Sequence, residues 1–433
     1  MKGCTRLSRI LHVKHTGAVI ELKRQSHHQG YQELIQAGQK GSGTNDNRTV
    51  TIIFGGDISF DGPVKYFAEV EKTCDYKRPF EKVRKLLATA DLRVANLESP
   101  LLKGAYIEKV PDNGKLISHY GSIDAVEGLK YAGFDIVQVA NNHFADFGVA
   151  GVKSTIAALK KAGIAYVGMQ DRVNKKTSQK PVIKTVNGLK IGFLSYCLNF
   201  EGCNTYKCEN EYCHDSTEGD NYIFGLGPAV FDKRTARNDI KRLSKRVDFT
   251  VVLMHWSQEY LLVPPLGMRE IAESLVVFGA TLVMGGHPHV IQGHECRGTG
   301  ALVVYSLGNF LFPKHSNTSL GIFLGGEKPT AAEVKSYPKV MKSVYSPSQI
   351  GMMFRVTLGR AGILAADYIP FDIKNDPKSN CLQPTPLTKN WIKFCGETDL
   401  HCINFRDVCA SMASTGDAFD NEKNEHLCIK GNN

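Results

Sequence analysis

The stretch ATLVMGGHPH, residues 280–289, combines an apolar run, two glycines and two histidines. Within it, Thr281–Met284 is short, apolar and rich in β-branched residues, which predicts a buried strand. The preceding stretch Met268–Phe278 has helical periodicity and ends at Gly279, where a left-handed helix C-cap is expected. A helix followed at once by a buried strand is typical of an α/β fold.

The same alternation extends from Val50 to Tyr305. It predicts strands over Val50–Gly55, Leu92–Ala95, Ile136–Val139, Lys190–Ser195, Phe249–Met254, Thr281–Met284 and Ala301–Tyr305. It predicts helices over Pro79–Ala88, Ser122–Tyr131, Val149–Ala162, Phe231–Arg246 and Met268–Phe278, several of them ending at a glycine such as Gly133 or Gly163. The chain is therefore expected to form an α/β core with a largely buried sheet.

The ends of the chain have a different composition from this core. Residues 1–48 are polar and basic, and GSGTNDNR (41–48) is typical of a flexible linker. From residue 373 onward the periodicity weakens and late cysteines accumulate. We predict a basic flexible segment (1–48), an α/β domain (49–372) and an irregular cysteine-containing C-terminal extension (373–433).

The net charge of +10 is concentrated at the N-terminus. Residues 1–48 contain eight Lys/Arg and three acidic residues, which is half of the excess. The basic run between Lys233 and Arg246 is spaced around Ile240, Leu243 and Val247, so we interpret it as the solvated side of an amphipathic helix. The charge permits a polyanionic partner, whereas a nucleic-acid partner would require a basic face interleaved with aromatic side chains, so we predict no nucleic-acid partner. No apolar run approaches the ~18 residues of a transmembrane helix.

Twelve cysteines are many for a protein of 433 residues. No CxxC pair occurs, which argues against a zinc ribbon. Clustering in loop-like segments instead predicts disulfides and an oxidising compartment, as in Cys203, Cys208 and Cys213 and in Cys381, Cys395, Cys402, Cys409 and Cys428. The sequons at Asn47 and Asn317 agree with this. However, Ile10–Leu22 is too polar for a signal peptide, so the compartment stays open unless a leader precedes Met1.

Polar side chains stand where the predicted strands end. VTIIFGGD ends in Asp57, DLRVANLE in Asn96 and Glu98, FDIVQVANNH in Asn141, Asn142 and His143, DFTVVLMHW in His255, and ATLVMGGHPH in His287 and His289. Ligands and catalytic groups collect at the carboxyl ends of strands in α/β sheets. We therefore expect seven residues to converge on one edge of the sheet: Asp57, Glu98, Asn142, His143, His255, His287 and His289.

Each of these residues also has a structural interpretation. Asp57 after two glycines could be a turn or N-cap residue, the Asn-Asn-His run could cap the next helix, and His255 could be a core histidine. The pair His287 and His289 is harder to explain by packing. In an extended segment residues i and i+2 face the same side, and Pro288 stiffens that spacing.

Together the set contains three imidazoles besides His143, two carboxylates and an amide. Such nitrogen and oxygen ligands suit Zn, Mn or Fe, and the absence of thiolates argues against a purely structural site. Two such ions about 3.5–4 Å apart would activate a bridging water and bind the oxygens of a phosphoryl centre. A histidine not bound to metal can donate a proton to the leaving group.

Six motifs occur in a fixed order: GGDIS, NLESPL, ANNHFADFG, HWSQEY, GGHPHVIQG and YSLGNFLF. In this order they resemble the CapA family of capsule biosynthesis (poly-γ-glutamate synthesis type), over a region from about Val50 to Phe312. That family is itself similar to the calcineurin-like metallophosphoesterases. The resemblance implies a four-layer α/β sandwich of metallophosphoesterase type, built around two mixed sheets.

The resemblance also implies roles for the site residues. By motif position, Asp57 is a ligand of the first metal, Glu98 bridges the two metals, and Asn142 is a ligand of the second. His143 is the acid near the leaving group. The remaining ligands are His255, His287 and His289, with Asn96 and Asn309 orienting them.

Two positions depart from the wider superfamily. Ser59 stands where a histidine is usual, and Glu98 stands where an aspartate is usual; both changes are usual in CapA-like proteins. One metal could therefore be a ligand short. Asp61 either reaches back to replace that ligand or is an exposed turn residue.

These features predict a metal-dependent hydrolase with two Mn, Zn or Fe ions, acting on a phosphoester or on a polyanionic amide such as poly-γ-glutamate. The alternative is a non-catalytic accessory protein that binds a polyanion during capsule or poly-γ-glutamate synthesis or export. A third interpretation is a structural protein with a vestigial site. Substrate, compartment and oligomeric state are left open.

Overall fold

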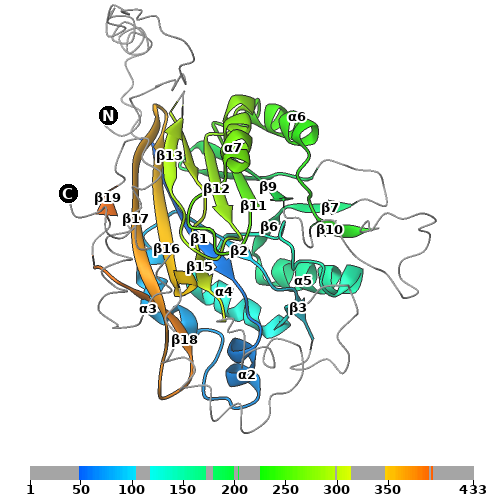
Figure 1. Ribbon diagram of the computed structural model, residues 1–433, viewed down its shortest axis with the longest axis vertical. Helices are drawn as coiled ribbons and strands as arrows, with labels where there is room; N and C mark the ends of the chain where they lie inside the picture. Colours follow the sequence, from blue (N-terminus) through cyan, green and yellow to red (C-terminus); the bar gives the residue numbers. More distant parts are fainter. Residues whose placement is uncertain are drawn as a thin grey trace, which may run out of the picture.

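The computed structural model describes residues 48–103, 118–171, 179–198, 203, 225–297, 300–313, 347–389 and 392–393. They form a mixed α/β fold with several sheets, two of them large (Figure 1). The α/β class expected from the sequence is confirmed.

The first large sheet has nine strands and is mixed in direction. Its central strands β1, β2, β5 and β6 are parallel, whereas β16, β17 and β18 pair antiparallel. In spatial order it contains β18 (Leu382–Pro386), β17 (Gly362–Asn375), β16 (Ile350–Gly359), β1 (Thr49–Ile58), β2 (Leu92–Leu97), β5 (Ile136–Gln138) and β6 (Ala165–Val167), with β15 (Asn309–Leu311) beside β1 and β19 (Ile392–Lys393) beside β17.

The second large sheet has six strands. Its four central strands are parallel and its two outer strands pair antiparallel. In spatial order it contains β13 (His294–Arg297), β14 (Ala301–Val304), β12 (Leu282–Gly286), β11 (Phe249–Trp256), β9 (Leu189–Leu198) and β8 (Val182–Val186). Two small sheets pair β3 (Leu101–Leu102) with β4 (Gly121–Ser122) and β7 (Met169–Asp171) with β10 (Leu226–Pro228).

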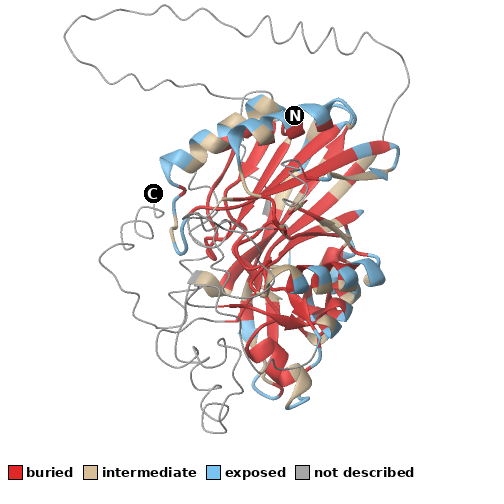
Figure 2. Ribbon diagram, turned by 90° about the vertical axis from the view of Figure 1, so that its right-hand side faces the viewer, coloured by how far each residue is buried: buried red, intermediate tan, exposed pale blue. Residues whose placement is uncertain are grey.

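Three apolar clusters show how these elements are layered. One cluster fills the space between the two large sheets, a second lies between the nine-stranded sheet and its helices, and a third lies between the six-stranded sheet and its helices. Figure 2 shows the strands almost wholly buried and the helices exposed on their outward sides. The first helix layer contains α3 (Glu81–Leu87), α4 (Val126–Ala132) and α5 (Gly148–Ala162), and the second contains α6 (Lys233–Ser244) and α7 (Leu266–Phe278).

The predicted elements are present with small shifts of their ends. Every predicted strand is found, and β1, β9 and β11 extend further toward the polar residues that follow them. Gly133, Gly163 and Gly279 adopt the left-handed conformation at helix C-caps, as expected. The short elements α2 (Pro63–Glu69), η1 (Arg78–Phe80), η2 (Ile123–Ala125) and η3 (Pro347–Gln349) complete the described fold.

Strand pairing continues beyond residue 372, where the sequence predicts the end of the α/β domain. Strand β17 runs to Asn375, and β18 pairs with it over Leu382–Pro386. Both strands therefore belong to the nine-stranded sheet. The predicted N-terminal segment up to residue 47, the sequon at Asn317 and the cysteines after Cys381 lie outside the described residues.

Two disulfides occur in the described part of the chain. Cys74 pairs with Cys381 across a sequence separation of 307, and Cys197 pairs with Cys203 across a separation of 6. The first fastens the segment after α2 to the start of β18. Nearby, Gln383 donates a hydrogen bond to the carbonyl of Arg78.

Among the residues that the structure describes, no helix has both the length and the hydropathy needed to cross a membrane.

Replacing both Cys74 and Cys381 by Ser should lower the free energy of unfolding by about 2–4 kcal/mol, because the disulfide restricts a very long loop in the unfolded chain. Denaturant unfolding of the purified full chain measures this. The double Cys197→Ser, Cys203→Ser variant is the control and should lose less, since it closes a loop with a separation of only 6. A larger loss in the control would contradict the expectation.

Candidate metal centre

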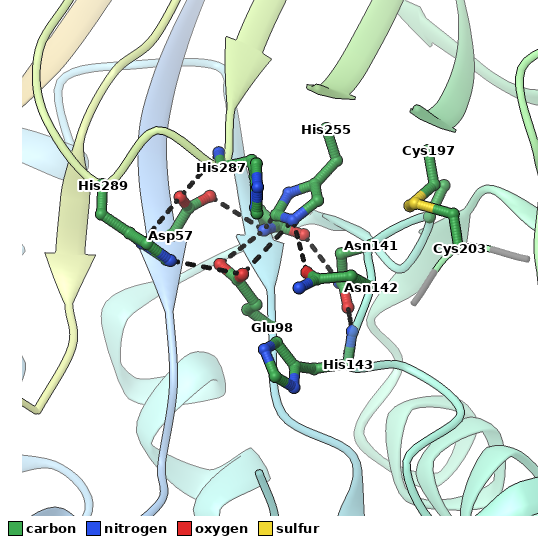
Figure 3. Close-up of polar contacts among 12 residues, drawn as sticks. Asp57, Glu98, Asn141, Asn142, His143, Cys197, Cys203, His255, His287 and His289 are labelled. Carbon is green, nitrogen blue, oxygen red and sulfur yellow. Dashed lines mark hydrogen bonds and ion pairs between the residues drawn. A yellow bond between two sulfur atoms is a disulfide. The ribbon is translucent and has the colours of Figure 1, made fainter. Parts of the chain in front are cut away.

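The predicted site residues come together between the carboxyl ends of strands from both large sheets (Figure 3). Asp57 lies in β1 and Glu98 directly follows β2, both in the nine-stranded sheet, whereas His255 lies in β11 of the six-stranded sheet. The expectation of a single sheet edge was therefore wrong. The side chains nevertheless converge: His255 Nε2 lies 3.3 Å from Glu98 Oε1, although the two residues belong to different sheets.

Asn96 links the acidic side of the site to the histidine side. Its Nδ2 donates to Asp57 Oδ1 at 2.8 Å and to Glu98 Oε2 at 3.3 Å, and lies 3.2 Å from His255 Nδ1. Asn141 in turn donates to Asn96 Oδ1 at 2.9 Å and to the carbonyl of Leu97 at 2.8 Å. This chain of amides fixes the orientation of both carboxylates.

His287 and His289 follow β12 and face the carboxylates. The backbone N–H of His287 donates to Asp57 Oδ2 at 3.0 Å, and His289 Nε2 lies 3.8 Å from Glu98 Oε1. The expected extended conformation of this segment was wrong, because the φ angles of His287 and His289 are 94° and 56°. These left-handed conformations are unfavourable for residues other than glycine, and such outliers cluster at functional sites.

Asn309, at the start of β15, contacts the imidazole ring of His289. Its Oδ1 lies 2.8 Å from His289 Nδ1, and its own Nδ2 donates to the carbonyl of Ser348 at 2.8 Å. Orienting a ligand histidine by a hydrogen bond to its second ring nitrogen is common at metal sites. This contact is consistent with the predicted role of Asn309 in orienting a ligand histidine.

The glycines beside the site allow its residues to approach closely. A side chain at Gly286 would place its Cβ 2.6 Å from Asp57 Oδ1, and one at Gly56 would place it 1.8 Å from the carbonyl oxygen of Gly308. Both distances are impossible for a real Cβ. Glycine is thus required at Gly56, where the obstacle is backbone, whereas a side chain at Gly286 would displace the Asp57 carboxylate from its place in the site.

Two groups of three residues have the donor types and spacing of a metal site. One is Glu98, His287 and His289, and the other is Asp57, Glu98 and His255; in each, the ligand atoms lie within 4.8 Å of one another. All five residues are buried. Their mixed nitrogen and oxygen donors fit a borderline divalent cation, and Glu98 belongs to both groups.

Negative charge is concentrated in this space. Burial by itself lowers the pKa of His289, but the carboxylates of Glu98, Asp57 and Glu259 outweigh that effect and raise its pKa above the usual value. A bound cation would offset the same negative charge.

Asn142 and His143 adjoin the two groups on the side of α5. Asn142 Oδ1 lies 2.8 Å from His255 Nε2, so its carbonyl oxygen points at the same space as the ligand imidazoles. His143 belongs to neither group. Its Nδ1 lies 2.6 Å from Asp146 Oδ2, and its backbone N–H donates to Asn141 Oδ1.

Some residues around the site were missed or misjudged from the sequence. Asp61 is neither an exposed turn residue nor part of either metal group, because it is fully buried, with its Oδ1 3.5 Å from Lys65 Nζ and its Oδ2 3.0 Å from His119 Nδ1. The His119 ring packs edge-on against the His143 ring at 4.2 Å between centroids. No sequence pattern pointed to His119. Asp146, by contrast, stands three residues after His143 in a motif already singled out.

Solved structures align with this chain at low similarity. A hypothetical protein from Thermus thermophilus matches with 15% identity over 74% of this chain and 99% of that chain, at a TM-score of 0.38. GAP50, described as the anchor in the inner membrane complex of Plasmodium, matches with 11% identity over 83% of this chain and 95% of that chain, at a TM-score of 0.32. No conclusion about the site follows from these similarities.

Curated relatives are more similar in sequence. The capsule biosynthesis protein CapA of Bacillus anthracis is 31% identical over 62% of this chain and 61% of its own length. The PGA biosynthesis protein CapA of Bacillus subtilis (strain 168) is 29% identical over 59% of this chain and 62% of its own length. The match thus spans about three fifths of each relative.

The family described as bacterial capsule synthesis protein PGA_cap matches residues 51–314. This region contains all the candidate metal ligands, from Asp57 to His289. The chain therefore belongs to the bacterial capsule synthesis protein family, PGA_cap.

Proposed function

We propose that this protein is a metal-dependent hydrolase of the CapA type, with two divalent ions held between its two large sheets. The observation that carries the proposal is the position of Glu98, which belongs to both buried groups of potential ligands. A carboxylate has two oxygens and can serve two cations at once. Packing alone gives no reason to bury Glu98 and Asp57 among three imidazoles.

The donor set divides naturally between two ions. In this proposal Glu98 serves both, Asp57 and His255 lie on one side, and His287 and His289 lie on the other. Asn142 adds a carbonyl oxygen beside His255. The bound ions, Mn, Zn or Fe by their preference for such ligands, would supply Lewis-acid activation of water and of an anionic oxygen.

His143 is the proposed proton donor to the leaving group. It stands beside the ligand residue Asn142 but outside both groups. Asp146 Oδ2 lies 2.6 Å from Nδ1, so Nε2 is the ring nitrogen that this proposal assigns to the substrate. A histidine held in this way by a carboxylate keeps one tautomer and one orientation, as general acids require.

The layer order supports assigning the fold to the four-layer metallophosphoesterase type. Helices, two face-to-face sheets and a second helix layer follow one another in the apolar clusters. The candidate ligands lie at the strand ends between those sheets.

The substrate class follows from the charge of the site and from the family. Two divalent ions would outweigh the two buried carboxylates and leave the site positive, which favours an anionic substrate. We propose a phosphoester or a polyanionic amide such as poly-γ-glutamate. The relatives' capsule and PGA biosynthesis names support the second, although the chain matches only about three fifths of their length.

The alternative is a non-catalytic protein that binds the polymer during its synthesis or export. It is favoured by Ser59, which is fully buried where the wider superfamily usually has a histidine. Polymer retention without turnover in the presence of Mn, Zn, Fe and Mg would support this alternative.

Glu98→Gln should remove nearly all bound metal, because one residue serves both proposed ions. Metal quantification on purified full chain, expected to give about two ions per chain in the unmodified protein, measures this. Glu270→Gln is the matched control: Glu270 is exposed on α7, belongs to neither group, and should leave the metal content unchanged. Full metal content in Glu98→Gln would refute the shared-ligand assignment.

His143→Asn should lower kcat toward an aryl phosphodiester on the order of 10²–10⁴-fold while leaving the metal content intact, because it removes a proton donor and no ligand. The loss should shrink with a nitrophenyl leaving group, which departs without a proton. Comparing phenyl and nitrophenyl esters measures this dependence. An equal loss on both esters would argue against proton donation, and no turnover of either by the unmodified protein would favour the binding alternative.

A further inference from the structure

A second feature that could bind a ligand lies on the outer helix layer of the six-stranded sheet. A groove of about 520 Å³ runs between the first turns of α6 and the end of α7. None of its lining residues belongs to the two metal groups. Four of them are basic residues of α6 and two are apolar residues of α7: Lys233, Arg234, Arg237, Lys241, Val277 and Phe278.

The cations of the groove form a regular row. Lys233, Arg237 and Lys241 are each four residues apart, so they lie on one face of α6 with about 6 Å of helix rise between neighbours. All three are exposed, and among the described residues no carboxylate forms an ion pair with them. The acid at the groove, Asp232, is occupied as the N-cap of α6, where it accepts a hydrogen bond from the backbone of Thr235.

The buried face of α6 determines that the cation row points outward. Ala236, Ile240 and Leu243 are buried against the six-stranded sheet and fix the rotation of the helix. The amphipathic helix expected from the sequence is therefore confirmed. Its cations therefore face outward, on the solvent side of the helix.

An apolar wall faces the row. Val277 is 74% exposed, whereas Leu275 in the same helix is completely buried. The end of α7 is held against α6, since a side chain at Gly279 would come within 3.5 Å of Ser244. The groove thus presents cations on one side and an apolar surface on the other.

We propose that this groove binds a linear polycarboxylate whose carboxylates face the cation row and whose methylene groups lie on Val277 and Phe278. Successive residues of an extended α-linked peptide are ~3.3–3.6 Å apart, and a γ-linked repeat is longer by two backbone atoms. The spacing of carboxylates along a γ-linked chain therefore approaches the ~6 Å of helix rise between neighbouring cations of the row. The choice of a γ-linked polyglutamate rests on the proposed function, whereas the anionic character of the ligand rests on the groove alone.

An anionic membrane surface fits the groove less well. Interfacial helices insert a broad apolar face, and the apolar face of α6 is in the protein core. Val277 is a single exposed apolar side chain on the wall of a concave groove. A polymer chain lying in the groove uses both of its walls.

The test measures binding of fluorescein-labelled poly-γ-glutamate to the purified full chain by fluorescence polarisation, at low and at high salt. The groove variant combines Lys233→Gln, Arg237→Gln and Lys241→Gln. The matched control combines Lys153→Gln, Lys160→Gln and Lys161→Gln, three exposed lysines of α5 on the opposite helix layer. Both variants lose three charges at exposed positions, so melting temperatures should be unchanged.

We expect the groove variant to raise the Kd on the order of tenfold at low salt, as for the loss of three exposed ion pairs, and the control to change it less than about twofold. Val277→Asp should also weaken binding. His289→Ala, which tests the metal centre, should change this Kd less than the groove variant does, so binding in the groove is tested separately from the proposed hydrolase activity.

Three results would contradict the proposal that the polymer binds in the groove. An equal loss in the α5 control would mean a non-specific charge effect. Loss of binding in His289→Ala but not in the groove variant would place the polymer at the metal centre. Weaker binding of the groove variant to phosphatidylserine-containing vesicles, with polymer binding retained, would identify a membrane-facing surface instead.

Discussion

The interaction on which the rest of the site depends is the close approach of two buried carboxylates, Asp57 and Glu98. Both are fully buried, and both accept a hydrogen bond from the same amide, Asn96. Two negative charges in a space closed to water are costly unless hydrogen bonds and positive charge offset them. The imidazole of His289, whose pKa these carboxylates raise, supplies part of that compensation. The remainder is the physical reason to expect cations there.

This electrostatic demand explains the unusual backbone around the site. Carboxylates from one sheet and imidazoles from the other must meet across the interface, so glycine stands where any Cβ would collide, as at Gly56 and Gly286. His287 and His289 adopt left-handed conformations that direct both rings at Glu98. The strain costs of order 1–3 kcal/mol per residue and persists only where surrounding contacts determine it. The N–H of His287 bonded to Asp57 and the ring of His289 held by Asn309 are such contacts.

The sequence predicts those parts of the molecule that depend on local pattern. Strand β11, the C-cap at Gly279 and the ligand types after each strand follow from periodicity and from residue chemistry. Features that depend on tertiary contact were not predictable. The division of the ligands between two sheets is set by packing far along the chain. The burial of Asp61 depends on His119, 58 residues away, and the turn at His287 contradicts the extended conformation that Pro288 favours.

The buried network beside His143 bears on the departure at Ser59. Where a further imidazole is usual, this chain has a small buried hydroxyl. Asp61, two residues on, is held by Lys65 and His119. An acid tied to a buried ammonium group is already compensated, so it has little reason to bind a cation. Asp57 and Glu98 remain as the buried carboxylates of the two candidate ligand groups. Two divalent ions would then leave the centre positive, and an anionic substrate would restore the balance.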